Sequence, residues 1–460
     1  MSRIYDLVVV GAGTGGCLAA KTAAKNGLNV CLIESKSGEK VGLKACGDAV
    51  GRHHFDNIGL AYPTGSELCW ELEGVEVFSP DFKTSFRIAG LGAKAFMVDR
   101  VEFGRRLVKE ALDAGVEFID KTTVLKPIIE NNYVVAVKVK SKSNFSSGIL
   151  KGRIFIDASG VSAILRRNAP EAPGFEKIVD SGDLEIAYRE IRVLDDEIHD
   201  KTFGSIYLSQ EYAPGGYFWL FPKGSNLVNM GLGVQFSRAS MDVKNYFTRF
   251  IRDKLPWLNK AKILDGRGAF VPTRRPLDNM VSNGLIVIGD AACQVNPIHG
   301  GGIGPSMTAG KIAGETAAKA LEKGDLSYRG LWSYNVTYMR GYGAKQASLD
   351  VFRVFLQNIS DDELNYGMSR KLIAEEDVLK ASLYGEVKLS ITDKTLRFLR
   401  SVGKLNLVLK LKRVAELMKT VKLHYQSFPE NPEEFSKWLE RTKALVEEYK
   451  MAVGMETFNS

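Results

Sequence analysis

The chain has 460 residues, of which 45% are hydrophobic and 25% charged, with a formal net charge of +8. A chain of this length is too long to fold around one ordinary hydrophobic core, so we predict two or three lobes. The composition is that of a soluble globular protein, and no apolar run approaches the roughly 18 residues that span a bilayer.

We also expect no secretory signal, because a buried strand is predicted from Tyr5 onward. The five cysteines are odd in number, scattered and without a C-x-x-C pair, which argues against a zinc site or a disulfide framework. We therefore predict a cytoplasmic protein.

The first 34 residues predict a dinucleotide-binding unit. Residues 5–10 form a run rich in β-branched residues, typical of a buried parallel strand, and residues 17–26 are Ala-rich and predict a helix. Between them stands a G-x-G-x-x-G motif, with glycines at Gly11, Gly13, Gly15 and Gly16. These allow a tight turn, close approach of a pyrophosphate and close packing of helix on strand.

A second predicted strand, residues 29–33, ends at Glu34. That acid follows Gly16 at nearly the spacing of about 20 residues expected for a carboxylate that holds a ribose hydroxyl.

The middle of the chain mixes elements. Residues 44–51 form a Gly-containing loop, and residues 75–98 alternate in short strand-like pieces. The sequence then predicts a helix from about residue 98 to 113, a strand over 115–124 and a hairpin of strands 133–140 and 152–156. Residues 154–160 resemble a strand end followed by a turn, at the edge where α/β sheets bind ligands.

From about residue 173 to 270 the helical periodicity fades, and short alternating strands, such as 185–192 and 227–234, predict a separate antiparallel sheet. Residues 284–288 return to a buried strand, which ends at Asp290. A second glycine loop over 299–304 precedes a predicted helix that reaches about residue 321, and everything after Ser327 is predicted to be helical.

Residues 391–425 carry nine Lys and Arg against two acidic residues, which is nearly the whole excess of positive charge. Leu, Val and Met lie between these cations without an aromatic ladder, so we expect no nucleic-acid partner. Two interpretations remain. One is a helical surface that meets anionic lipid or a phosphorylated substrate, and the other is a solvated helix face over a core stripe.

The chain has two glycine loops, each after a strand, that lie almost 290 residues apart. An extended FAD requires such a loop at each end, one for its ADP half and one for its ribityl and ring half. Together with residues 157–160 and 288–292, they resemble the FAD-dependent superfamily typified by p-hydroxybenzoate hydroxylase. Within it, residues 214–222 match the P-x-x-Y-x-W-x-F-P pattern of geranylgeranyl reductases at every defined position. The resemblance covers roughly residues 4–325, and the length suits the archaeal digeranylgeranylglycerophospholipid reductase type.

This resemblance implies an α/β fold: a Rossmann-type FAD-binding domain with an inserted antiparallel-sheet substrate domain and a helical C-terminal region. We predict the FAD-binding domain over 1–172 and 275–326, the substrate domain over 173–274 and the helical region over 327–460.

The resemblance also assigns residues to FAD. Glu34 holds the adenosine ribose, Val124 meets the adenine through its backbone, and Arg100 reaches the pyrophosphate or ribityl region. Asp290 accepts from a ribityl hydroxyl, and Gly302 and Ile303 offer N–H groups to the flavin. The expected cofactor-binding residues are Gly11, Gly13, Gly15, Gly16, Glu34, Cys46, Gly47, Ala49, Arg100, Val124, Asp290, Gly302 and Ile303.

Many relatives have Asp-Gly where this chain has Asp157-Ala158. Capping of the local turn therefore explains Asp157 as well as a role in the site does. His53 and His54 lack a third ligand at metal spacing, and we assign no metal.

The implied reaction is saturation of geranylgeranyl C=C bonds, most plausibly on archaeal ether-lipid precursors, by hydride from reduced flavin. Tyr217, Trp219 and Phe221 alternate, so they share one face of a strand and form an aromatic wall for a polyprenyl chain. Cys46, Tyr217 and Trp219 are the expected catalytic residues, with Cys46 or Tyr217 as proton donor. Cys46 is otherwise a small buried thiol, or a partner of Cys293.

We expect an external electron donor, NADPH or ferredoxin. If residues 391–425 contact lipid, we expect the protein to lie peripherally on the inner face of the membrane. A flavin monooxygenase of the same superfamily and a non-catalytic flavin- or lipid-binding protein are the alternatives.

Overall fold

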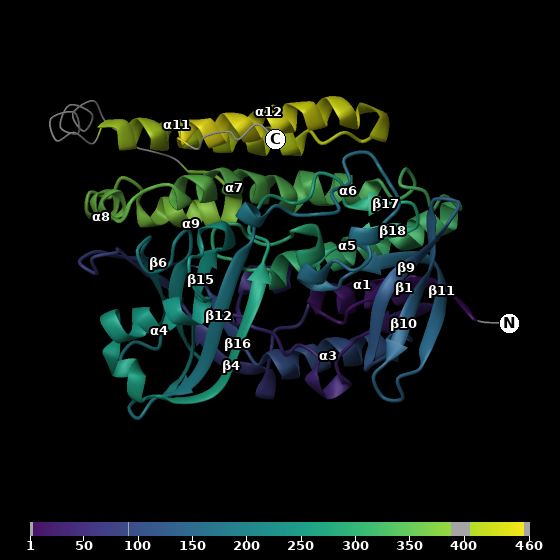
Figure 1. Cartoon of the computed structure of the whole chain (residues 1–460), viewed down its shortest axis with the longest axis horizontal. Helices are drawn as coiled ribbons and strands as arrows, with labels where there is room; N and C mark the ends of the chain where they lie inside the picture. The colour runs from purple at the N-terminus through teal and green to yellow at the C-terminus, as the bar shows by residue number, and fades with distance from the viewer. Residues whose placement is uncertain (1–2, 91, 388–404, 455–460) are drawn as a thin grey trace.

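A computed structural model describes residues 3–90, 92–387 and 405–454 of the chain. Two large sheets lie at opposite ends of an elongated molecule, and helices from the second half of the chain extend along both (Figure 1). The fold is mixed α/β, as the sequence predicts.

The first sheet has the strand order β17-β18-β11-β1-β2-β8 and is parallel except for the short antiparallel pair β17 and β18, and β9 and β10 extend from β11 as an antiparallel hairpin. Its strands are β1 (Ile4–Val10), β2 (Val30–Ile33), β8 (Glu117–Ile119), β9 (Thr122–Glu130), β10 (Tyr133–Ser141), β11 (Ser147–Asp157), β17 (Val281–Ser282) and β18 (Leu285–Val287). The single strand expected over 115–124 is two strands, because Lys121 takes a left-handed φ of 47° between β8 and β9.

Helix α1 (Thr14–Lys25) begins three residues earlier than predicted, because Thr14, Gly15 and Gly16 already belong to its first turn. It packs against α5 (Ile303–Lys323) and α3 (Arg100–Asp113). The carboxylate of Asp99 caps α3 by accepting from the N–H groups of Val101 and Glu102. These three helices come from distant parts of the chain, but each is a neighbour in sequence of a strand of the first sheet.

The second sheet has the order β16-β12-β15-β14-β13-β5-β6 and is antiparallel except for the parallel pair β5 and β13. Its strands are β5 (Gly74–Phe78), β6 (Ser85–Ala89), β12 (Glu185–Val193), β13 (Phe203–Leu208), β14 (Tyr217–Pro222), β15 (Leu227–Gln235) and β16 (Lys262–Val271). Residues 74–89 therefore join this sheet rather than the first. A small third sheet contains β3 (Ala49–Gly51), β4 (Leu68–Leu72) and β7 (Ala95–Val98).

One helix within the strand-rich region was not predicted. Helix α4 (Val243–Lys254) buries Val243, Phe247 and Phe250 against one face of the second sheet, where Phe250 stacks on Phe218 at 4.3 Å between ring centroids. The opposite face of β14 is thereby left for the site. The predicted domain boundaries at 172, 274 and 326 stay predictions.

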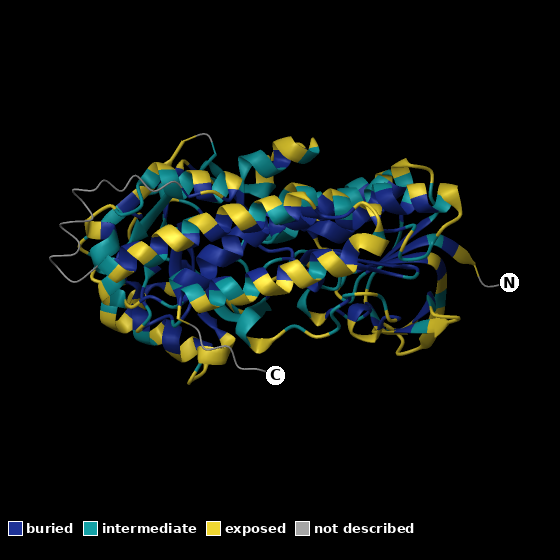
Figure 2. Cartoon of the chain, turned by 90° about the horizontal axis from the view of Figure 1, so that it is seen from above, coloured by how far each residue is buried: buried dark blue, intermediate teal, exposed yellow. Residues whose placement is uncertain are grey.

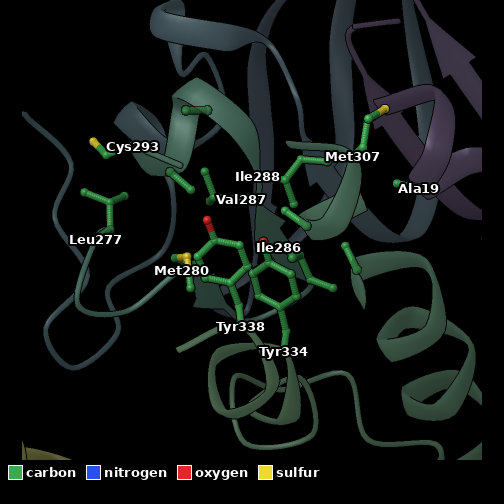
Figure 3. Packing of buried hydrophobic residues seen from close by; sticks show 14 of the residues in the cluster. Ala19, Leu277, Met280, Ile286, Val287, Ile288, Cys293, Met307, Tyr334 and Tyr338 are labelled. Atoms are coloured by element: carbon green, nitrogen blue, oxygen red, sulfur yellow. The ribbon is translucent and has the colours of Figure 1, made fainter. Parts of the chain in front are cut away.

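The C-terminal part is helical, as predicted. It includes α6 (Ser333–Tyr338), a π-helical segment (Met339–Gly343), α7 (Ala344–Gln357), α8 (Asp361–Ser369), α9 (Glu375–Tyr384), α11 (Leu405–Gln426) and α12 (Phe435–Ala452). One short helix of the N-terminal part, α2 (Arg52–Ile58), contacts α5 and β3. Figure 3 shows Tyr334 and Tyr338 of α6 packed against Ile286 and Met280, so this helix completes the core beside β18.

Helices α11 and α12 form an outer layer whose outward face is exposed (Figure 2). Of the basic stretch 391–425, residues 391–404 lie outside the described residues. In the described part, Arg413 pairs with Glu448 and Lys422 with Glu386, over a buried stripe that includes Leu411 and Val414. Within 3–90, 92–387 and 405–454, every helix is too short or too polar to cross a bilayer.

Candidate active site

The first glycine loop joins β1 to α1 and leaves space for a ligand. The N–H of Gly11 donates to the carbonyl of Ile33 at 2.8 Å, and Gly11 has a φ of +103° that favours glycine. A Cβ on Gly16 would lie 1.9 Å from the carbonyl oxygen of Gly11, so the helix approaches the strand as closely as a glycine permits. A Cβ on Gly13 would meet no atom within 4 Å. Gly13 therefore faces open space at the start of α1.

Glu34 lies at the end of β2, directly beside this loop. Its Oε2 accepts from the N–H of Ala12 at 2.9 Å, and its Oε1 accepts from the N–H of Lys36 at 2.9 Å. Oε1 also accepts from the Ser35 hydroxyl at 3.1 Å, so three bonds fix the direction of the carboxylate and Oε2 keeps a lone pair for a further donor.

Arg100 begins α3 near the same space. Its Nε and Nη1 atoms are buried and have no hydrogen-bond partner among the described residues. Buried guanidinium nitrogens are costly without a partner, so this arginine indicates an anionic ligand. The open space at Gly13 and the unpartnered nitrogens of Arg100 fit the pyrophosphate of FAD. Val124, the residue expected at the adenine, is buried in β9.

The second glycine loop adjoins the first although almost 290 residues separate them. The Thr14 and Ser306 hydroxyls lie 2.8 Å apart and join α1 to α5. Asp290 Oδ2 accepts from the Lys44 ammonium at 2.5 Å, and this carboxylate raises the pKa of Lys44. Gly302 caps α5, and a Cβ on it would lie 3.2 Å from Asp290 Oδ1. Asp290, Gly302 and Ile303 are thus brought together at the N-terminus of α5.

Asp157, the other acid noted in the sequence, has a structural environment. Its Oδ2 accepts from the N–H groups of Leu165 and Arg166 at 2.8 Å each, and its Oδ1 accepts from Ser159. It is fully buried. These bonds describe a carboxylate that organises the turn after β11.

The loop that carries Cys46, Gly47 and Ala49 is tied to the second sheet by a network that sequence reasoning missed. Asp48 and Lys223 are nearly buried, and their ion pair measures 2.8 Å. Asn229 Nδ2 lies 2.8 Å from both Asp48 Oδ2 and the carbonyl of Cys46. The pair spans 175 residues of sequence, so neither local pattern indicated it.

Tyr217, Trp219 and Phe221 share one face of β14, as their alternation predicts. The Tyr217 hydroxyl donates to the carbonyl of His299 at 2.7 Å, and Trp219 Nε1 donates to Asn229 Oδ1 at 3.0 Å. A Cβ on Gly47 would lie 3.2 Å from the Phe221 ring. This aromatic face therefore lies against the Cys46 loop at one end and the second glycine loop at the other.

Both candidate proton donors keep their protons at neutral pH. Burial raises the pKa of the Tyr217 phenol, and the nearby Glu185 carboxyl adds to the effect. Burial likewise raises the pKa of the half-buried Cys46 thiol, although Arg100 opposes it. Cys46 and Cys293 are both free cysteines, and Cys293 is buried.

An apolar cavity of about 220 Å³ opens at Tyr217 and His299. It extends between β5, β6 and β13 of the second sheet and helices α7, α8, α9 and α11. One carboxyl on its wall, Glu185, has its pKa raised to about 7 by burial. The apolar lining includes Val77, Phe86, Ile88, Ile206, Leu208, Phe352, Phe355, Leu364, Met368, Leu372, Val378, Leu407 and Leu411.

Comparisons with known proteins agree with this geometry. Residues 183–271 match the geranylgeranyl reductase catalytic domain, and residues 6–169 match FAD dependent oxidoreductase. The chain is 40% identical to the digeranylgeranylglycerophospholipid reductase of Sulfolobus acidocaldarius over 450 residues, which covers 98% of this chain and 99% of that protein. It is 36% identical to digeranylgeranylglycerophospholipid reductase 2 of Methanococcoides burtonii, covering 79% and 87% respectively.

Among solved structures, the fold is similar to a geranylgeranyl bacteriochlorophyll reductase-like protein of Thermoplasma acidophilum. The TM-score is 0.76 at 25% identity, with 87% of this chain and all of the other covered. The glycine loops that fit FAD, the complete aromatic motif and the full-length similarity lead to one assignment: the chain belongs to the digeranylgeranylglycerophospholipid reductase family and is an FAD-dependent oxidoreductase.

Proposed function

We propose that this protein saturates the C=C bonds of the geranylgeranyl chains of a digeranylgeranyl glycerophospholipid. The observation that carries the proposal is the apolar cavity, which begins at the aromatic face of β14 and offers a long hydrocarbon almost only carbon contacts. Burying a methylene group in such surroundings contributes about 0.8 kcal/mol. A polyprenyl chain has the matching shape and chemistry.

The residues around the cavity mouth orient the chain and exclude water. When bound, FAD supplies the hydride that the reduction needs. Trp219 and Phe221 are nearly buried and hold the wall in place, and the hydrogen bond from Trp219 to Asn229 fixes its ring. Such an aromatic wall keeps an isoprene unit in register with the reacting atoms.

The second hydrogen is a proton, and we assign it to Tyr217 or Cys46. Each lies in the site with its proton retained at neutral pH, as donation requires. The phenol already donates to the carbonyl of His299, which aims its oxygen at the second glycine loop. After donation, the group recovers a proton from solvent.

Each saturated bond consumes two electrons, so the proposal includes an external donor, NADPH or ferredoxin. It also includes peripheral contact with the inner face of the cytoplasmic membrane, where such lipids reside. The exposed Lys412 and Lys419 of α11 support that contact, because cations are attracted to anionic headgroups.

The decisive experiment reduces the FAD-loaded protein with dithionite under anaerobic conditions and adds a geranylgeranyl glycerol phospholipid. We expect lipid masses that rise in steps of two hydrogens while the flavin is reoxidised. An unchanged lipid beside a flavin that stays reduced would exclude this substrate, and air with NADPH would then test the monooxygenase alternative.

A pair of matched variants tests the cavity itself. Leu208→Trp places a bulky ring in the cavity and is expected to abolish lipid reduction while FAD stays bound. Ile263→Trp adds the same ring to an exposed position of the same sheet and is expected to retain wild-type activity. Equal activity of the two variants would contradict this assignment of the cavity.

A further inference from the structure

A group of basic side chains lies at the second glycine loop, and of its members only His299 was placed in the site above, through its carbonyl and as part of the cavity wall. We define the basic cluster as His53, His54, His299 and Lys345. Its members come from α2, the second glycine loop and α7, three parts of the chain that are distant in sequence. Their convergence is therefore a property of the fold.

The two histidine rings of α2 contact each other at an interplanar angle of 39°, and His54 also contacts the start of α5. Their ring centroids lie 4.1 Å apart. A Cβ on Gly304 would lie 2.1 Å from the His54 ring, so the ring occupies space that a side chain in the first turn of α5 would fill. The Tyr342 ring completes the contact, with its centroid 6.2 Å from that of His54 and 5.0 Å from the Lys345 ammonium.

Tyr342 reaches this position through an irregular helix. It belongs to the π-helical segment Met339–Gly343, where Gly341 leaves helical geometry with φ −87° and ψ −109°. Such segments are frequent at functional sites. The irregularity turns Tyr342 and Lys345 toward the α2 histidines.

The cluster lacks an acidic partner. Within residues 3–90, 92–387 and 405–454, no carboxylate forms an ion pair with any of its four members. Both ring nitrogens of His53 are buried, and in that same part of the chain they have no hydrogen-bond partner. The acid that acts on His53, Asp56, is exposed and accepts from the Tyr62 hydroxyl at 2.6 Å. A basic group buried without a counterion destabilises the fold unless an anion joins it.

The lowered pKa values of the four basic groups agree with a site that binds an anion. Loss of hydration lowers the pKa of His53 and of His299 to about 4 in each case, and Lys345 adds to both shifts. His299 is nevertheless exposed where it borders the cavity. Burial lowers the pKa of Lys345 to about 8, so it still carries its charge at neutral pH. His54 is shifted down by burial and by His53, Lys345 and His299. At neutral pH the three histidines are therefore uncharged, and Lys345 carries the positive charge that a bound anion would neutralise.

The cluster and the apolar cavity share a residue. His299 lines the cavity together with Tyr217 and Pro297, and it is electrostatically coupled to Lys345 and His53. An apolar cavity that ends beside imidazole groups and the Lys345 ammonium fits an anionic amphiphile. We propose that the basic cluster binds the phosphate group of the lipid whose prenyl chain occupies the cavity, an inference that rests on the proposed function.

The test compares lipid substrates with and without phosphate. In the dithionite-reduced holoenzyme, Lys345→Met removes the charge at nearly constant length, and we expect a KM for the phospholipid about 10- to 100-fold higher. The KM for the corresponding neutral diether, which lacks phosphate, should change less than threefold. Lys345→Arg should restore the phospholipid KM, and Lys323→Gln, at the far end of α5, serves as the matched control.

A second measurement does not depend on lipid reduction. Binding of inorganic pyrophosphate to the oxidised holoenzyme, measured by calorimetry, should weaken at least tenfold in Lys345→Met and in His53→Gln, with FAD content unchanged and a melting temperature no lower than that of the wild type. Undiminished pyrophosphate binding, or equal effects on the phosphorylated and neutral lipids, would overturn the inference.

The remaining outcomes separate the sources of phosphate. If Lys345→Met slows flavin reduction by NADPH but leaves the phospholipid KM unchanged, the phosphate belongs to a nicotinamide donor, and the lipid assignment fails. If wild-type protein reduces neither lipid, the proposed function fails, and loss of pyrophosphate binding in Lys345→Met would still identify the anion site.

Discussion

Replacing Lys223 with methionine removes the ammonium that neutralises Asp48, and we expect it to destabilise the protein by about 3–5 kcal/mol. The two side chains are 8% and 3% exposed and lie 2.8 Å apart, so the carboxylate left behind cannot reach water. Its remaining donor is the Asn229 amide, and Asp48 Oδ1 already lacks a partner among the described residues. Asp48→Asn strands the ammonium instead and should cost a similar amount.

The double variant distinguishes a coupled pair from two independent residues. Because Lys223→Met with Asp48→Asn leaves no buried charge, it should cost clearly less than the sum of the single variants, giving a coupling energy of about 2–3 kcal/mol. Urea unfolding of the FAD-bound protein, followed by tryptophan fluorescence, measures these values. Single variants that each cost less than about 1 kcal/mol, or strictly additive effects, would refute the reasoning.

Other predictions concern single groups in the site. The pKa of Glu185 is raised from 4.5 to about 7 in the folded protein, so its stabilising effect is present below about pH 4.5 and is lost as pH rises through about 7. The urea midpoint should fall across this window by an amount equivalent to at most about 3 kcal/mol, and Glu185→Gln should remove the decline; an identical decline in the variant would contradict the assignment. Gly13→Val should abolish FAD binding without lowering the melting temperature of the apoprotein, because a Cβ there meets no atom within 4 Å; a variant purified with stoichiometric FAD would argue against this position for the pyrophosphate. Tyr217→Phe removes the bond to the His299 carbonyl, costs about 1 kcal/mol of stability, and lowers alkene reduction if the phenol is the donor. Cys46→Ser tests the other donor, and either variant that reduces lipid at the wild-type rate while retaining FAD excludes its residue.

The parts of the fold that sequence predicted are those whose determinants are local. The strand, glycine turn and helix over 4–25 follow from consecutive residues, and Glu34 lies one strand further along. The aromatic face of β14 likewise follows from alternation over six residues. In these cases the residues that determine the structural element are consecutive in the sequence, so the hydrophobic pattern alone indicates it.

The missed features had two different causes. Helix α4 had a readable signal, because its buried residues Val243, Tyr246, Phe247, Phe250 and Ile251 recur at helical spacing, but the surrounding strands obscured it. The ion pair of Asp48 and Lys223 had no local signal, because its partners are brought together only by the packing of a loop on a distant strand.

The close packing of α1 on α5 has a consequence for how the protein matures. A Cβ on Gly310 would lie 2.2 Å from the carbonyl oxygen of Gly15, so these helices meet backbone to backbone. The cofactor site is therefore complete only after about two thirds of the chain has been synthesised, and β18 must still pair with β11. A nascent chain that ends before residue 303 holds the glycine-rich turn without its second half. We therefore expect FAD to bind only after these long-range contacts of the chain have formed.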